Sequence, residues 1–337
     1  MVADVPSSAA PYKDRSTALI LVGILLLGLA LLELLGLVFV ILSTVMAASM
    51  PLPPGAVRPT PMPTSSLVLV SLLYGGTAVF FGWMGIGTIQ ARRWAGTLML
   101  VVSWLWLAIG TFGTAFLVVV LPETFARVQA VTRRTAEPPG QGFVFGCVVF
   151  FSALFLIALP GLLVLFYRGP NVRATFAARD PELHWTERCP APVLAIVLCY
   201  AATAVYSLCS VPLGYAFVFG RVVTGAAAVA AYLAFAAISA ALVPGLYRLR
   251  PWAWWALLAF LVLGAASSFP LLFGNADLSE MYRQMGTPAQ AQLFGGAFFS
   301  RPAVRVLMAI LLAGYVGYLL WIRRYFTAPK PAPASAS

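Results

Sequence analysis

Residues 167–190 read YRGPNVRATFAARDPELHWTERCP and form the one sizeable polar passage deep inside an otherwise apolar chain. The passage lies near the middle of the sequence and holds its only histidine, His184. On either side, long apolar runs alternate with short basic turns in a similar order. This position predicts that the passage connects two halves built alike.

The composition places the chain in a membrane. Of 337 residues, 61% are hydrophobic and 9% are charged, and the mean hydropathy is +0.93. A soluble domain is usually about 25% charged, so most of these helices cannot present a polar face to water. The lipid bilayer is therefore the predicted surrounding. The net charge of +11 gathers at the ends of apolar runs, which indicates membrane orientation and anionic lipid head groups, with no nucleic acid as partner.

Eight apolar runs reach the roughly 20 residues that a helix needs to cross a bilayer. The runs are continuous instead of alternating, which excludes a membrane β-barrel. The sequence thus predicts an all-α, polytopic membrane bundle of about eight transmembrane helices. These spans are 17–46, 67–89, 95–121, 142–166, 191–216, 222–246, 252–273 and 303–322.

The two halves share a motif. GxxxxRRWA at 87–95 recurs as GxxxxRPWA at 245–253, 158 residues later. The spacing predicts a 4+4 internal repeat, with its symmetry axis along the membrane normal. The alternative is that any helical hairpin places arginine and tryptophan at the interface.

The predicted interface anchors are Arg92, Arg93, Trp94, Arg250 and Trp252. The predicted units are a cytoplasmic tail (1–16), a first four-helix half (17–167), a cytoplasmic connector (168–190), a second half (191–323) and a disordered tail (324–337).

Basic residues also predict the orientation. The two tightest turns, 90–95 and 247–251, hold two arginines each. Short loops weigh most in the positive-inside rule. We therefore expect both termini and the connector to be cytoplasmic.

In the longest outer loop, the spacing of Leu278, Met281, Tyr282 and Met285 suggests either a short amphipathic helix on the membrane or ordinary loop packing. Phe125, Val128 and Val131 hint at the same in the first half.

Glu33 is the one acidic residue within a predicted span. A charge at the bilayer centre costs on the order of 2.5–3.5 kcal/mol, and no span offers a cation at matching depth. The carboxyl is predicted to be neutral, to face a wet cavity, or to bond a hydroxyl. It either couples transport to a proton or cation, or holds helices together. The hydroxyls considered are those of Tyr200, Tyr206, Ser207 and Tyr232.

The connector gathers the chain's acid, histidine and thiol groups. Their spacing matches no zinc pattern, and a cysteine–histidine nucleophile needs a fold that a short loop lacks. We expect no catalytic residue, no metal and no cofactor. The groups are Asp180, Glu182, His184, Glu187 and Cys189. The connector is instead the best place for a membrane-protein partner to bind, through Asp180, His184, Trp185 and Arg188.

Three parts of the connector carry a resemblance: Arg173-Ala174-Thr175, Asp180-Pro181, and the run 185–190. They resemble a loop of uncharacterised bacterial multi-pass membrane proteins. The resemblance implies a bacterial inner (plasma) membrane and no particular activity. The sequence favours a non-enzymatic small-solute transporter or an accessory subunit of a membrane complex, with a homo-oligomer possible. The alternative is a membrane-embedded, lipid-modifying enzyme with an inner-face site.

Overall fold

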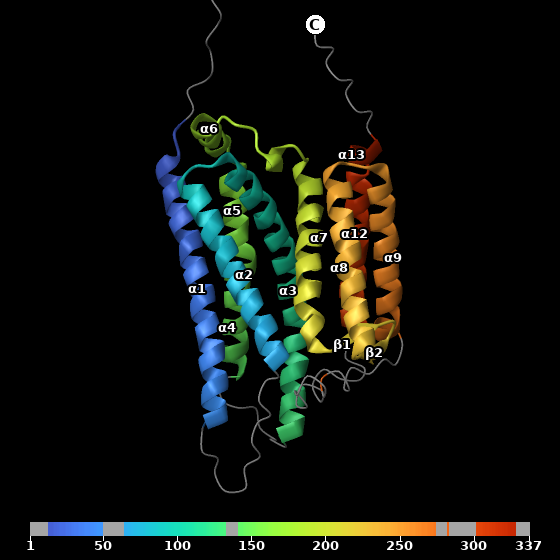
Figure 1. Cartoon of the computed structure of the whole chain (residues 1–337). Coiled ribbons are helices and arrows are strands. Elements are labelled where there is room, and N and C mark those ends of the chain that lie inside the picture. Colours follow the sequence, from blue (N-terminus) through green and yellow to red (C-terminus); the bar gives the residue numbers. More distant parts are fainter. Residues whose placement is uncertain (1–12, 50–63, 133–140, 274–281, 283–300, 328–337) are drawn as a thin grey trace, which may run out of the picture.

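The computed structural model describes residues 13–49, 64–132, 141–273, 282 and 301–327. Figure 1 shows a bundle of long, steeply aligned helices. Among the described residues, eight helical segments are long and apolar enough to cross a membrane, which confirms the eight predicted spans. The tails at 1–12 and 328–337 lie outside the described residues, as does the predicted amphipathic helix at 278–285 apart from Tyr282.

The described part of the first half contains five α-helices and one π-helical turn. Its third helix continues past Pro122 to Thr132, beyond the predicted end at 121. Proline removes one backbone donor, but the residues after it include good helix formers, so the helix persists. Residues 125–131 therefore continue this helix in place of a separate surface helix. The elements are α1 (Ser16–Ser49), α2 (Thr64–Ile89), α3 (Arg93–Thr132), α4 (Gln141–Ala153), η1 (Leu154–Ala158) and α5 (Leu159–Arg168).

The connector forms a short helix and a 3-10 turn, α6 (Pro170–Arg179) and η2 (Trp185–Glu187). The second half then follows with its own four spans. Its elements are α7 (Ala191–Ser210), η3 (Val211–Leu213), β1 (Tyr215–Val218), β2 (Arg221–Thr224), α8 (Ala226–Tyr247), α9 (Pro251–Phe273), α12 (Pro302–Ile322) and α13 (Arg324–Thr327).

A β-hairpin joins α7 to α8, where the sequence predicts helix on both sides of a short loop. Strands β1 and β2 pair antiparallel, with Tyr215 opposite Thr224. Phe219 and Gly220 form the turn with φ of 48° and 79°. Two consecutive positive φ values are typical of a two-residue hairpin turn. The strand β1, with the sequence YAFV, is apolar like the end of the span before it, so hydropathy alone does not reveal it.

A π-helical turn interrupts the fourth span just before Pro160. Proline has no N–H, so it cannot satisfy the carbonyl of Leu156 four residues earlier. That carbonyl lies against Gly110 of α3, where any Cβ would collide with it. The expected helix distortion at Pro160 is thus a local widening that brings α3 and the fourth span into close contact.

The turn between α2 and α3 closes with two backbone hydrogen bonds. The N–H of Arg92 donates to the Gly87 carbonyl at 2.9 Å, and the N–H of Ala91 donates to the Thr88 carbonyl at 3.0 Å. Ala91 adopts a positive φ of 52°. This is the Schellman ending of a helix. A Cβ at Gly87 would lie 2.7 Å from the Trp94 ring, so glycine lets the tryptophan fold back onto α2.

The turn between α8 and α9 has the same geometry at the expected spacing. Arg250 donates to the Gly245 carbonyl at 2.9 Å, and Leu249 has φ of 53°. A Cβ at Gly245 would lie 2.6 Å from the Trp252 ring. The repeated motif therefore forms one and the same turn in both halves.

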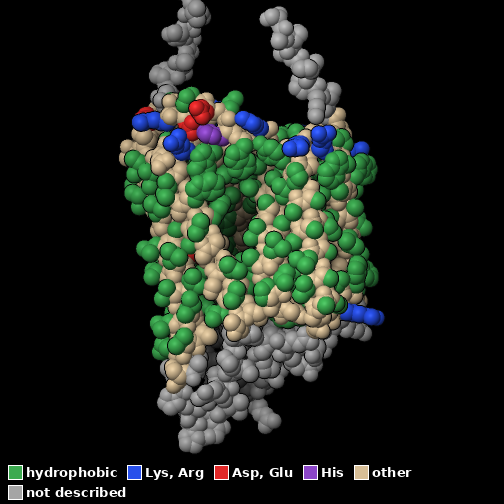
Figure 2. All heavy atoms as spheres, in the orientation of Figure 1, with side chains coloured by type: hydrophobic (Ala, Val, Ile, Leu, Met, Phe, Trp, Pro, Cys, Tyr) green, Lys and Arg blue, Asp and Glu red, His purple; other side chains and the backbone are tan. Residues whose placement is uncertain are grey.

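The start of α1, the connector and α13 lie at one end of the bundle, called the connector end below (Figure 1). The β-hairpin lies at the opposite end. Charged side chains cluster at the connector end in Figure 2, while the flank of the bundle is apolar. Eight spans place both ends of the described chain on one side, as predicted.

The packed core is also concentrated at the connector end. It joins both halves, and each of its residues lies in the connector, in the α2–α3 turn or in the connector-side half of a span. Large members include Leu26, Met84, Tyr167, Leu194 and Leu257. Toward the other end, the described residues form only a small cluster around Val120 and Val304. Among the described residues, the core is therefore densest at the connector end.

Candidate functional site

The connector is fastened to the turn between α2 and α3. Asp180, which ends α6, accepts a hydrogen bond from the backbone N–H of Arg93 at 3.1 Å. Arg93 is the first residue of α3, where backbone N–H groups have no partner within the helix. Asp180 thus caps a helix 87 residues away in the sequence. Its side chain is only 6% exposed.

The side chain of Arg93 makes a second bond to the connector. Its Nε donates to Oε1 of Glu187 at 2.7 Å, and both side chains are largely buried. Charge-assisted bonds of this length are among the stronger ones in proteins. Arg93, predicted as an interface anchor, therefore also ties the turn to the connector.

His184 completes the cluster. Its Nε2 lies 2.9 Å from the same Asp180 oxygen that accepts from Arg93. Burial alone would raise the pKa of Asp180, but the bonds from Arg93 and His184, with the charges of His184 and Arg92, lower it below the ordinary 3.8. Asp180 is consequently ionised near neutral pH.

Trp185 links the connector to the second half. The Tyr247 hydroxyl at the end of α8 donates to the Trp185 carbonyl at 2.9 Å. The Trp185 ring remains 44% exposed, and Arg188 is exposed too. Of the four predicted partner-binding residues, Asp180 and His184 are thus engaged within the chain, while the side chains of Trp185 and Arg188 face outward.

The other reactive groups of the connector do not converge on one point. Glu187 is held by Arg93, and Glu182 is exposed. Cys189 is buried, which raises its pKa to about 11, so its thiol is a poor nucleophile. Within the described ranges, no group of three histidine, cysteine or acidic residues is placed to hold a metal ion. The arrangement is that of a structural clamp.

Glu33 lies between two helices of the first half. The Thr77 hydroxyl of α2 lies 3.3 Å from Glu33 Oε2. The predicted hydroxyl bond thus exists, but its donor is Thr77 instead of one of the four predicted hydroxyls. Nearer the connector end, the backbones of α1 and α2 approach closely, because a Cβ at Gly85 would lie 3.0 Å from the carbonyl of Gly23. Short-range contact between small residues explains why this pair packs without a polar core.

A hollow separates the two halves near mid-height. Figure 2 shows it between α2 and α7, in front of α3; we call it the groove. α3 contacts helices of both halves. Two of its buried hydroxyls, those of Ser103 and Thr114, have no hydrogen-bond partner in the part of the chain that the structure describes. Buried polar groups usually have one, and both side chains are enclosed in the bundle, with exposed fractions of 0% and 7%.

The remaining predicted interface anchors differ in how far their side chains are exposed and in what they contact. Trp94 stacks on Trp83 with ring centroids 4.4 Å apart. Trp252 is 53% exposed, as an interfacial tryptophan would be. Arg92 and Arg250 are exposed at the connector end.

These features define a polytopic integral membrane protein, with eight spans and a connector clamped onto one interhelical turn. No protein family, no curated protein and no solved structure matches the chain. The resemblance of the connector to bacterial multi-pass proteins stays a prediction.

Proposed function

We propose that this protein is a non-enzymatic membrane protein that passes a small solute between its two four-helix halves. The observation that carries the proposal is the groove, which lies beyond a core that closes the connector end. A bundle whose described core is densest at one end resembles one state of an alternating-access cycle, in which halves rock about a central site.

The groove favours a solute that is mainly apolar with a hydrogen-bonding group. Figure 2 shows no charged side chain at its rim, so a strongly charged solute would lack a partner there. The unpartnered hydroxyls of Ser103 and Thr114 belong to the helix behind the groove. Both are buried here, so a solute would reach them only when the halves move apart, and it would then gain binding free energy because the hydroxyl is already desolvated.

Glu33 is less suited to couple transport. It lies between α1 and α2 and bonds Thr77, both within the first half, so it is not at the boundary between the halves. We infer that it mainly holds these two helices together. Glu33→Gln preserves a hydrogen-bonding group and should leave transport intact.

Thermal-shift screening and vesicle uptake test the proposal. The full chain in detergent is screened against small neutral solutes, and solutes that raise its melting temperature are tested for uptake into proteoliposomes. Ser103→Ala should weaken the shift and the uptake. Thr111→Val on the same helix is the control, because its exposed hydroxyl already bonds the Leu107 carbonyl. Equal effects of both variants, or no uptake of any stabilising solute, would refute the proposal.

An accessory-subunit role is the second candidate. The outward side chains of Trp185 and Arg188, beside the 66% exposed Leu183, offer an apolar and basic surface at the connector end. Such a surface suits a partner with an acidic, aromatic segment. A lipid-modifying enzyme is disfavoured, because Asp180 and Glu187 are committed to the α2–α3 turn.

We also infer a bacterial inner-membrane location, cytoplasmic termini and a true internal duplication. The basic turns support the orientation. The matching Schellman turns at Gly87 and Gly245 support the duplication, since two unrelated hairpins need not share glycine, positive φ and a folded-back tryptophan.

A further inference from the structure

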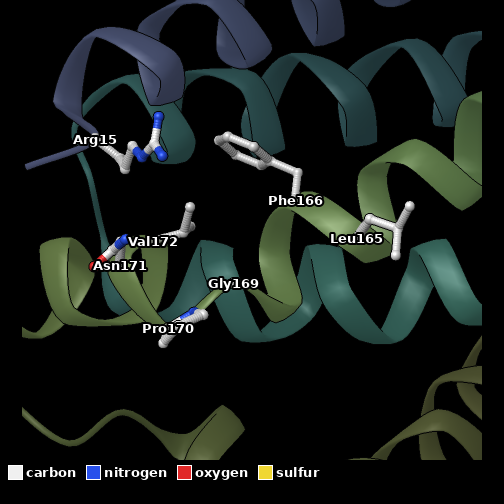
Figure 3. Close-up of a pocket in the computed structure, with 7 residues that line it drawn as sticks. All are labelled: Arg15, Leu165, Phe166, Gly169, Pro170, Asn171 and Val172. Atoms are coloured by element: carbon white, nitrogen blue, oxygen red, sulfur yellow. The ribbon is translucent and has the colours of Figure 1, made fainter. Parts of the chain in front are cut away.

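A pocket of about 330 Å³ opens at the connector end, where the start of α1, the end of α5 and the beginning of α6 meet. Figure 3 shows Arg15 and Phe166 on one side of it and Asn171 and Val172 on the other. Its volume falls at the lower end of the roughly 300–1,000 Å³ typical of ligand pockets. Arg15 makes one wall of the pocket cationic, and the other lining side chains are largely apolar.

The charge of Arg15 is available to a ligand. Its backbone N–H donates to the Thr175 hydroxyl at 3.1 Å and so holds α1 against α6. Its guanidinium makes no hydrogen bond or ion pair with the residues that the structure describes. The nearby acid, Asp14, bonds Ser16 and pairs with Arg179 at 3.7 Å, so it leaves Arg15 unneutralised.

The apolar part of the pocket continues into the lipid-facing surface. Leu165 lines the pocket and is 70% exposed, and Leu162 on the same helix is 64% exposed. Both belong to the fourth span, which ends at Arg168. The pocket therefore lies at the boundary between hydrocarbon and water, with its cation on the water side.

We propose that this pocket binds one anionic phospholipid, with Arg15 contacting the phosphate and an acyl chain lying along Leu165 and Leu162. A guanidinium can bind a phosphate through two parallel hydrogen bonds, which suits a fixed headgroup position. A soluble phosphate would gain nothing from the apolar wall, whereas a lipid uses both parts. The lipid would join α1, α5 and α6, and it does not depend on the proposed transport.

Native mass spectrometry of the full chain tests the proposal. The protein is purified from mixed phosphatidylglycerol and phosphatidylcholine nanodiscs, and the lipids that stay bound are counted. We expect retention of phosphatidylglycerol over phosphatidylcholine, and a loss of about tenfold in Arg15→Gln, the order set by one charge-assisted contact. Because the Arg15 guanidinium makes no hydrogen bond or ion pair in the described chain, this variant should fold.

Two further variants sharpen the outcome. Arg173→Gln removes the same charge from an exposed site on α6 that does not line the pocket, so retention should be unchanged. Leu165→Glu leaves Arg15 intact but sets a negative charge against the acyl chain, so retention should fall. The proposal is overturned by equal losses in Arg15→Gln and Arg173→Gln, by equal retention of the two lipids, or by retention that survives both pocket variants. Displacement of the lipid by millimolar inorganic phosphate would also overturn it, since the site would then bind the free anion.

Discussion

The carboxylate of Asp180 and the backbone N–H of Arg93 lie 3.1 Å apart, and this bond accounts for a difference between the two halves. At the 158-residue spacing of the recurring motif, the position of Arg93 is taken by Pro251. Proline has no N–H and is favoured at the first position of a helix. The second turn therefore needs no cap at this position, whereas the first turn takes its cap from the connector.

Asp180→Ala should destabilise the protein through loss of this cap. Removing a helix cap costs about 0.5–2 kcal/mol, and we expect the upper part of that range because Asp180 is buried. The measurement is thermal or denaturant unfolding of the full chain in detergent. The cost of Asp180→Ala should shrink in an Arg93→Pro background, which removes the donor. It should persist in Arg93→Gln, which keeps the N–H and loses only the ion pair to Glu187. Equal costs in these two backgrounds would contradict the capping role.

Asp180 should also make stability depend on pH in the acid range. Burial opposes ionisation, but the bonds from Arg93 and His184 outweigh it, so the folded-state pKa is below the ordinary 3.8. The stabilisation is then complete above the unfolded pKa of about 3.9 and is lost as pH falls below it through the folded value. Unfolding measured across this range for the native chain and for Asp180→Asn should give curves that converge toward low pH. Curves that stay parallel would show that Asp180 does not titrate as proposed.

Gly87→Ala and Gly245→Ala should each destabilise their turn. The added methyl group would lie 2.7 Å from the ring of Trp94 or 2.6 Å from that of Trp252. Overpacking of this kind typically costs about 1–3 kcal/mol. Gly82→Ala in α2 is the matched control, since a Cβ there meets nothing within 4 Å. Alanine is the better helix former, so this control should be neutral or stabilising by up to about 1 kcal/mol. A control that loses as much stability as Gly87→Ala would point to helix flexibility instead of the tryptophan contact.

The spans and tight turns were predictable because they depend on local properties. Hydropathy sets the spans, and the Gly–Trp spacing at 87–95 and 245–253 sets the turns. The clamp was not predictable, because it joins Asp180 to Arg93 across 87 residues and no local pattern indicates that partner. One signal was present: the exchange of Arg93 for Pro251 between the motifs indicates that only the first turn has an N–H to satisfy. The partner of Glu33 was not predictable from the sequence either, because the packing of α1 against α2 decides that Thr77 lies beside it.

Gly110→Ala should disrupt the contact between α3 and the π-helical turn. Any Cβ at Gly110 would collide with the Leu156 carbonyl, which is backbone and cannot rotate away. We expect a loss of at least about 2–3 kcal/mol, at the upper end for overpacked sites. Gly113→Ala, one turn further along α3, meets nothing within 4 Å and should be tolerated. The two variants are compared by unfolding in detergent. A Gly110→Ala protein as stable as Gly113→Ala would mean that the two helices separate freely at this point.

The orientation is tested by labelling single cysteines in a chain whose four native cysteines are replaced. Glu182→Cys lies in the connector and Arg221→Cys in strand β2, and both positions are exposed at opposite ends of the bundle (Figure 1). If the connector is cytoplasmic, a membrane-impermeant maleimide should label Arg221→Cys on intact cells. It should label Glu182→Cys only after the cells are permeabilised. The reverse pattern would invert the predicted orientation, since the basic turns at 90–95 and 247–251 would then lie outside against the positive-inside rule. Labelling of both cysteines from outside would contradict the span assignment itself, because an odd number of crossings must separate these positions.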